Sequence, residues 1–132
     1  MRTKPSLDLR DADAIAAACR AAAIDAGARV SIAVVDEAGG LLHFQRLDGA
    51  RAYSADLAIR KARTAASVGV PTRMIEAMAR AGQPMSGEVL AVSGGVPVLH
   101  DGQCAGAVGV SGASGDEDVR IAEAGLPRAA GL

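Results

Sequence analysis

Hydrophobic positions recur every three to four residues in four segments of the chain, which is the period of an amphipathic helix. These segments are residues 8–26, 54–68, 73–81 and 115–125. Ser54 and Thr72 stand where side-chain caps of the second and third helices are expected. Ser114 followed by Glu117 matches a capping box, so the fourth helix should begin next to this pair.

Strand patterns occupy four further segments, residues 30–35, 41–46, 96–100 and 104–111. Asp101-Gly102 joins the last two and is a typical hairpin-turn dipeptide. A further short strand is expected over 88–92. Because the strands come as hairpins, we predict an antiparallel sheet of four or five strands flanked by helices, in one α+β domain spanning residues 1–132.

The strand 104–111 has one face made only of small residues, which are Ala105, Ala107, Gly109 and Ser111. Such a face lets either a helix or a ligand approach the strand closely. The strand runs into a glycine-rich loop at 112–115. The free backbone N–H groups of that loop, at the start of a helix, could bind an anion. Capping by Ser114 and Glu117 would satisfy the same N–H groups, and this is the interpretation that we favour.

One stripe of the helix 54–68 contains Lys61 and Thr64 between apolar residues, with Arg60 at its edge. This placement suggests a partly buried cation that faces a hollow over the small-residue strand. The alternative is that Lys61 extends its stem along the surface to reach water.

The composition narrows the classes of function. Aromatic residues make up 2% of the chain, so its core must be built from small aliphatic side chains. Burial of apolar surface against a second copy would stabilise such a domain, and we therefore expect a homo-oligomer. A net charge of −1 argues against nucleic-acid binding. No signal peptide or membrane-length apolar run is visible, so we expect a cytoplasmic protein without membrane contact. Neither the cysteines nor the acidic residues have metal-ligand spacing, and no metal site is expected.

Three segments together resemble the GlcG/HbpS group of haem-binding-like proteins, which includes the C-terminal domain of PduO proteins. They are VSIAVVDEAGGLLHFQRLDGA, DLAIRKARTAAS and GGVPVLHDGQCAGAVGVSGASGDEDVRIAEAGL. The resemblance covers roughly residues 6–126. It implies a profilin-like fold that assembles as dimers or larger oligomers, and some members bind haem or are linked to cobalamin pathways. The matching motif positions are Asp36, Arg46, Lys61, Thr64, Gly94, Gly95, Ser111 and Asp118.

The first functional hypothesis is a small-ligand-binding protein whose ligand is haem or another tetrapyrrole, as the resemblance implies. Haem needs an axial ligand, and the histidines of this chain are His43 and His100. Arg46, Arg60 and Lys61 are the candidates to pair with the propionates.

The second hypothesis is a cofactor-independent hydrolase, lyase or isomerase that acts on a small carboxylate. Lys61 and Arg46 would bind the carboxylate, and an acidic residue such as Asp36 or Glu117 would serve as general base. Thr64 or Ser111 would orient the substrate. A third hypothesis, an assembly module without a ligand, explains the small residues as packing but leaves Lys61 and Thr64 unexplained.

Overall fold

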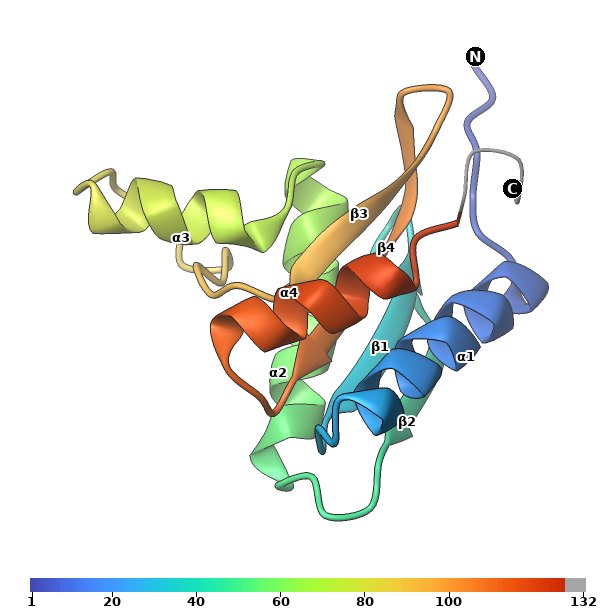
Figure 1. Ribbon diagram of the computed structural model, residues 1–132. Helices are drawn as coiled ribbons and strands as arrows, with labels where there is room; N and C mark the ends of the chain where they lie inside the picture. Colours follow the sequence, from blue (N-terminus) through green and yellow to red (C-terminus); the bar gives the residue numbers. More distant parts are fainter. Residues whose placement is uncertain (128–132) are drawn as a thin grey trace.

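A four-stranded antiparallel sheet forms the middle layer of the protein, in a computed structural model that describes residues 1–127 (Figure 1). The elements in chain order are α1 (Leu9–Asp25), β1 (Ser31–Asp36), β2 (Leu41–Arg46), α2 (Tyr53–Val68), α3 (Thr72–Arg80), β3 (Gly95–His100), β4 (Gln103–Ser111) and α4 (Gly115–Ala124). The strand order is β2-β1-β4-β3. The predicted α+β class is therefore confirmed, with four strands. Residues 128–132 of the predicted 1–132 domain lie outside the described part.

Helices cover both faces of the sheet. On one face, α1 and α4 pack on the branched side chains of the two central strands, among them Ile32 and Val110. On the other face, α2 packs alanine against alanine, with Ala58 and Ala62 over Ala33. Figure 1 shows α3 projecting away from this body. Within residues 1–127, no helix has the length and apolarity that a membrane crossing requires.

The small-residue face of β4 is occupied by α2. A Cβ at Gly109 would overlap the Ala58 carbonyl oxygen, and a Cβ at Gly95 would overlap the Lys61 carbonyl oxygen. Gly109 and Gly95 are register partners on neighbouring strands, so together they form a shallow track for the helix. Of the two occupants that the sequence allowed for this face, the structure shows the helix.

A β-bulge changes which β4 residues share a face. The register between β3 and β4 shifts between Val98 and Leu99. As a result, the Cys104 thiol lies 3.7 Å from the Ala66 carbonyl oxygen of α2, whereas Ala105 packs in the core with α1. The strict alternation predicted over 104–111 holds from Gly106 onward and fails at its first two residues.

Three local predictions are wrong because tertiary contacts use the same hydroxyl or backbone groups. Ser54 lies inside the first turn of α2 rather than at its cap, and its hydroxyl is 2.9 Å from that of Ser31. Thr72 is likewise the first residue of α3, and its hydroxyl accepts a hydrogen bond from Gly95 N at 2.9 Å. The stretch 88–92 is not a strand, since Leu90 N donates to the Thr64 hydroxyl at 3.2 Å.

The fourth helix begins as the sequence predicts, with one half of the expected capping box. Ser114 is the N-cap, and its hydroxyl accepts from Glu117 N at 3.2 Å. Ala113 N donates to the Asp118 carboxylate at 3.0 Å. These donors are therefore satisfied within the chain, which is the reading that the sequence favoured over an anion site.

Candidate functional site

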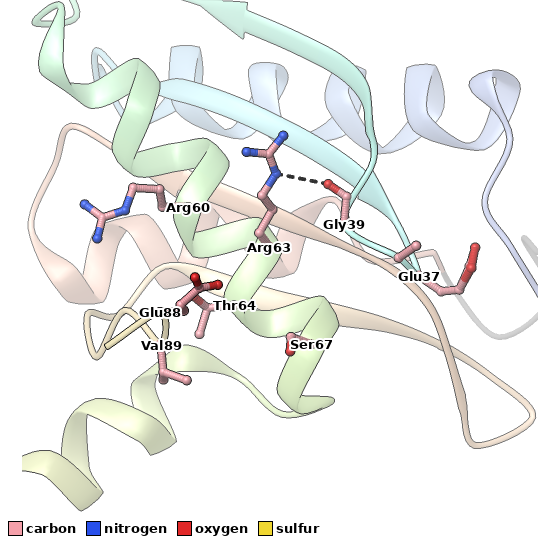
Figure 2. Close-up of a pocket in the computed structure, with 9 residues that line it drawn as sticks. Glu37, Gly39, Arg60, Arg63, Thr64, Ser67, Glu88 and Val89 are labelled. Carbon is pink, nitrogen blue, oxygen red and sulfur yellow. Dashed lines mark hydrogen bonds between the residues drawn. The ribbon is translucent and has the colours of Figure 1, made fainter. Parts of the chain in front are cut away.

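A cavity of about 600 Å³ opens between α2, the β1–β2 turn and the segment around Glu88 (Figure 2). It is called the α2 cavity here. Its lining residues are Glu37, Ala38, Gly39, Arg60, Arg63, Thr64, Ser67, Glu88 and Val89. Its volume is within the range of about 300–1,000 Å³ that is usual for small-molecule sites.

Two arginines on one face of α2 give the cavity its positive charge. Arg60 and Arg63 are three residues apart, a spacing that places side chains side by side on a helix. Arg63 Nε donates to the Gly39 carbonyl oxygen at 3.1 Å, which fixes the guanidinium and leaves its terminal N–H groups available. Among the described residues, neither arginine forms an ion pair with a carboxylate.

The two acidic residues of the cavity differ in their partners. Glu37 turns away from both arginines in Figure 2. Its carboxylate accepts from the Ser6 hydroxyl at 2.6 Å and lies 3.9 Å from Lys4 Nζ. Glu88 has no ion-pair partner among residues 1–127. Since Lys4 compensates Glu37, the cavity lining carries two guanidiniums and one carboxylate without an ion-pair partner among residues 1–127, and the cavity favours an anionic ligand.

Lys61, the residue on which the sequence hypotheses depend most, does not line this cavity. Its side chain is 3% exposed, and Nζ donates to the Asp118 carboxylate at 3.1 Å and to the Val110 carbonyl oxygen at 3.0 Å. The ion pair joins α2 on one face of the sheet to α4 on the other. Of the two placements that the sequence left open for Lys61, the structure shows burial, and the partner of the cation is an internal carboxylate.

The Asp118 carboxyl is as deeply buried as its partner. Burial raises the pKa of Asp118 above its ordinary value, and attraction to Lys61 opposes part of this shift. Its other oxygen accepts from Ala113 N. Asp118 thus has a partner for each oxygen, and it ties the end of β4 to the start of α4.

Gly94 and Gly95 make room for this arrangement. Gly94 has a positive φ of 130°, and a Cβ there would lie 2.9 Å from Lys61 Nζ and 2.5 Å from the Val110 carbonyl oxygen. A Cβ at Gly95 would overlap the backbone of Lys61. In this structure both glycines allow α2 and the Lys61 side chain to approach the sheet, and neither lines the α2 cavity.

The other two predicted catalytic residues lie elsewhere. Asp36 closes the β1–β2 turn, where its carboxylate accepts from Ala38 N at 3.0 Å and from Gly40 N at 2.8 Å. Glu117, at the start of α4, pairs with Arg120 at 2.5 Å. Asp36 stands opposite Gly106 in the sheet, about 13 Å along the strands from Val110, beside which Lys61 Nζ lies. The structure does not gather Lys61, Asp36 and Glu117 around one space.

Arg46 and Ser111 flank Ser31 in the register of the sheet. Arg46 is exposed at the end of the edge strand β2, and Ser111 is buried. Neither residue lines the α2 cavity. Of the predicted ligand-binding residues, Arg60 and Thr64 are the two that the structure brings into it.

His43 lies on the α1 side of the sheet with both ring nitrogens occupied. Nδ1 is 3.1 Å from an Asp13 carboxylate oxygen, and Nε2 is 3.0 Å from the Gln45 amide nitrogen. His100 is exposed beside the β3–β4 turn, and it lines a separate hollow of about 380 Å³. Among residues 1–127, no three metal-ligating side chains cluster in a way that would hold an ion.

Sequence reasoning missed several residues of the α2 cavity. Arg63 and Ser67 continue the polar stripe that Arg60 and Thr64 begin, at the three- and four-residue spacing of a helix face. That spacing is visible in the sequence. Glu37 and Glu88 carry no comparable signal, because only the folding of the turn and of the segment 86–90 brings them beside α2.

A family model described as haem degrading protein HbpS-like matches residues 7–127. The chain belongs to the HbpS-like family. Among curated relatives of this HbpS-like chain, protein GlcG of Escherichia coli strain K12 is 41% identical over 114 residues, which is 84% of this chain and 85% of GlcG. The resemblance seen in the sequence motifs is thereby confirmed.

Solved structures of the HbpS-like family share the fold. Protein ORFY of Klebsiella pneumoniae aligns with a TM-score of 0.90 and 32% identity, over 96% of this chain and 92% of ORFY. A double mutant of Streptomyces reticuli HbpS aligns with a TM-score of 0.86 and 39% identity, over 100% of this chain and 90% of that one. A PduOC:heme complex aligns with a TM-score of 0.85 and 25% identity, over 96% and 95%.

Proposed function

We propose that this HbpS-like protein binds a small ligand in the α2 cavity, and that the ligand is a tetrapyrrole such as haem. The observation that carries the proposal is the pair of guanidiniums, Arg60 and Arg63, which stand at the cavity without a carboxylate partner among the described residues. The family description and the PduOC:heme complex support a tetrapyrrole as the ligand.

The residues of the cavity fit one part of haem and not the other. Each guanidinium offers several N–H donors in a fork that suits a propionate carboxylate. Protein ligands of haem iron are usually His, Cys, Met or Tyr, and none of these lines the cavity. The chain can therefore hold and orient the propionate edge of the macrocycle, and no step is assigned to the iron.

Binding is proposed ahead of catalysis because the predicted catalytic groups are already engaged. Lys61 is paired with Asp118, Asp36 holds the β1–β2 turn, and Glu117 is paired with Arg120. A small carboxylate could still enter the α2 cavity. Of the lining carboxylates, Glu37 turns away toward Ser6 and Lys4, and we do not assign it as a general base.

Native mass spectrometry of the protein as purified, together with haem titration, tests the proposal. We expect a saturable change of the Soret band at one haem per chain. Arg63→Ala should weaken binding about tenfold or more, because a hydrogen bond to a charged group contributes about 1.5–3 kcal/mol. Arg20→Ala, which removes an exposed arginine from α1, is the control. Absence of saturable binding in the unaltered protein would contradict the proposal.

A further inference from the structure

The arginine pair of the α2 cavity offers one guanidinium to each of two carboxylates of the same ligand, and Figure 2 draws the two guanidiniums extending from α2 in different directions. Arg60 and Arg63 are separated by three residues, so their Cβ atoms are about 5–6 Å apart. Thr64 and Ser67 follow each arginine by four residues and place hydroxyl groups on the same side of the helix. The two propionates of a haem-type tetrapyrrole leave adjacent rings on one edge of the macrocycle. A dicarboxylate presents the same chemistry in a smaller molecule.

In the described part of the chain, the lining of the cavity contains none of the usual protein ligands of haem iron. Neither histidine lines it. His43 has partners for both ring nitrogens on the opposite side of the sheet. His100 belongs to the smaller hollow near Lys4 and Asp101, which contains no arginine. Lys61 is held inside the protein by Asp118.

We infer that the α2 cavity recognises a pair of neighbouring carboxylates and does not recognise the iron. This inference rests on the proposed function, since it concerns the same cavity and names the feature of the ligand that is bound. Arg63 is held in place by Gly39 before the ligand arrives, which lowers the entropy lost on binding. Within residues 1–127, Glu88 lines the cavity without an ion-pair partner, and its negative charge weakens the binding of an anion.

Four probes separate the carboxylates from the iron: haem, iron-free protoporphyrin IX, the dimethyl ester of protoporphyrin IX, and succinate. Binding of the tetrapyrroles is followed by absorbance and porphyrin fluorescence, and binding of succinate is measured directly by isothermal titration calorimetry. We expect haem and protoporphyrin to bind with dissociation constants within about threefold of each other, because iron contributes little. The dimethyl ester should bind at least about tenfold more weakly, since it lacks the charges.

The variant Arg60→Ala/Arg63→Ala should weaken haem and protoporphyrin to the same extent. Arg10→Ala/Arg20→Ala removes two exposed arginines from α1 and keeps the net charge equal to that of the test variant, so it should leave binding unchanged. Glu88→Gln should strengthen the binding of both tetrapyrroles. Circular dichroism of each variant confirms that the fold is retained.

The outcomes distinguish this inference from the proposed function. The inference is overturned, while tetrapyrrole binding stands, if haem binds and protoporphyrin does not, or if the diester binds as well as the diacid. In the first case, His100→Ala tests whether the hollow beside the β3–β4 turn supplies an iron ligand. If succinate binds through the arginine pair and no tetrapyrrole does, the inference holds and the tetrapyrrole proposal fails. If no probe binds, both fail.

Discussion

At the scale of single residues, the sequence allows two interpretations of Lys61, which is either a partly buried cation or a side chain that reaches water. A lysine among apolar neighbours indicates a buried cation, and burial is what the structure shows. The identity of its partner depends on a residue 57 positions away. Desolvating two charges costs much of what their attraction returns, so removing one partner harms stability more than removing both.

We predict that Lys61→Met lowers the free energy of unfolding by about 3–5 kcal/mol, because it leaves Asp118 buried without a counter-charge. The double variant Lys61→Met/Asp118→Leu should recover a large part of that loss. Urea unfolding measures each variant, with the exposed Lys4→Met as control. A double variant whose loss equals the sum of the two single losses would contradict this account of the pair.

The pH dependence of stability reports on the same carboxyl. Burial raises the folded-state pKa of Asp118, so the folded chain keeps a proton at pH values where the unfolded chain has lost it. The contribution of this group to stability is therefore fully present below the unfolded pKa and declines as pH rises through the folded pKa. The unfolding free energy of the unaltered protein minus that of Asp118→Asn should decrease from acidic to neutral pH. An increase would contradict the direction of the shift.

At the scale of elements, the glycines of the sheet decide how closely α2 can pack. Gly109 has no positive φ that would require a glycine, so its role is to leave space for the backbone of α2. The helices begin and end close to their predicted limits, because periodicity and caps are local. The caps expected at Ser54 and Thr72 failed because neighbouring strands bind the same hydroxyls.

We predict that Gly109→Ala destabilises the protein by about 3 kcal/mol, the upper end of the usual range for overpacking, because the new methyl group meets the backbone of α2. Gly87→Ala is the matched control, since a Cβ there meets nothing within 4 Å. The two variants are compared by urea unfolding. Equal stability would show that α2 can move away from the sheet without cost.

At the scale of the whole molecule, α3 stands apart from the three layers (Figure 1). Met74 and Met78 are 49% and 38% exposed on it. A helical pair of methionines is usually core or interface, and the chain itself does not bury this pair. The homo-oligomer expected from the composition remains a prediction, and α3 is where we expect contact between copies.

Light scattering after size exclusion tests this expectation. We predict a mass at least twice the 13.2 kDa of one chain, and a shift to the monomer in Met74→Glu/Met78→Glu, because charges are costly to bury between copies. Ile24→Glu changes an exposed apolar residue of α1 and should leave the mass unchanged. A monomeric unaltered protein would contradict the prediction.

The sequence by itself determined the helices, the hairpins, the patterns of the four strands and the family, because periodicity, turn residues and adjacent motif positions are all local signals. For Lys61 it left two placements open, a partly buried cation and a side chain that reaches water. Only the tertiary structure decided that α2 fills the small-residue face, that Asp118 neutralises Lys61, and that Arg60, Arg63 and Glu88 meet at a cavity. The physical reason is that charge pairing and cavity shape depend on which distant segments the packing brings together, and no local pattern records that.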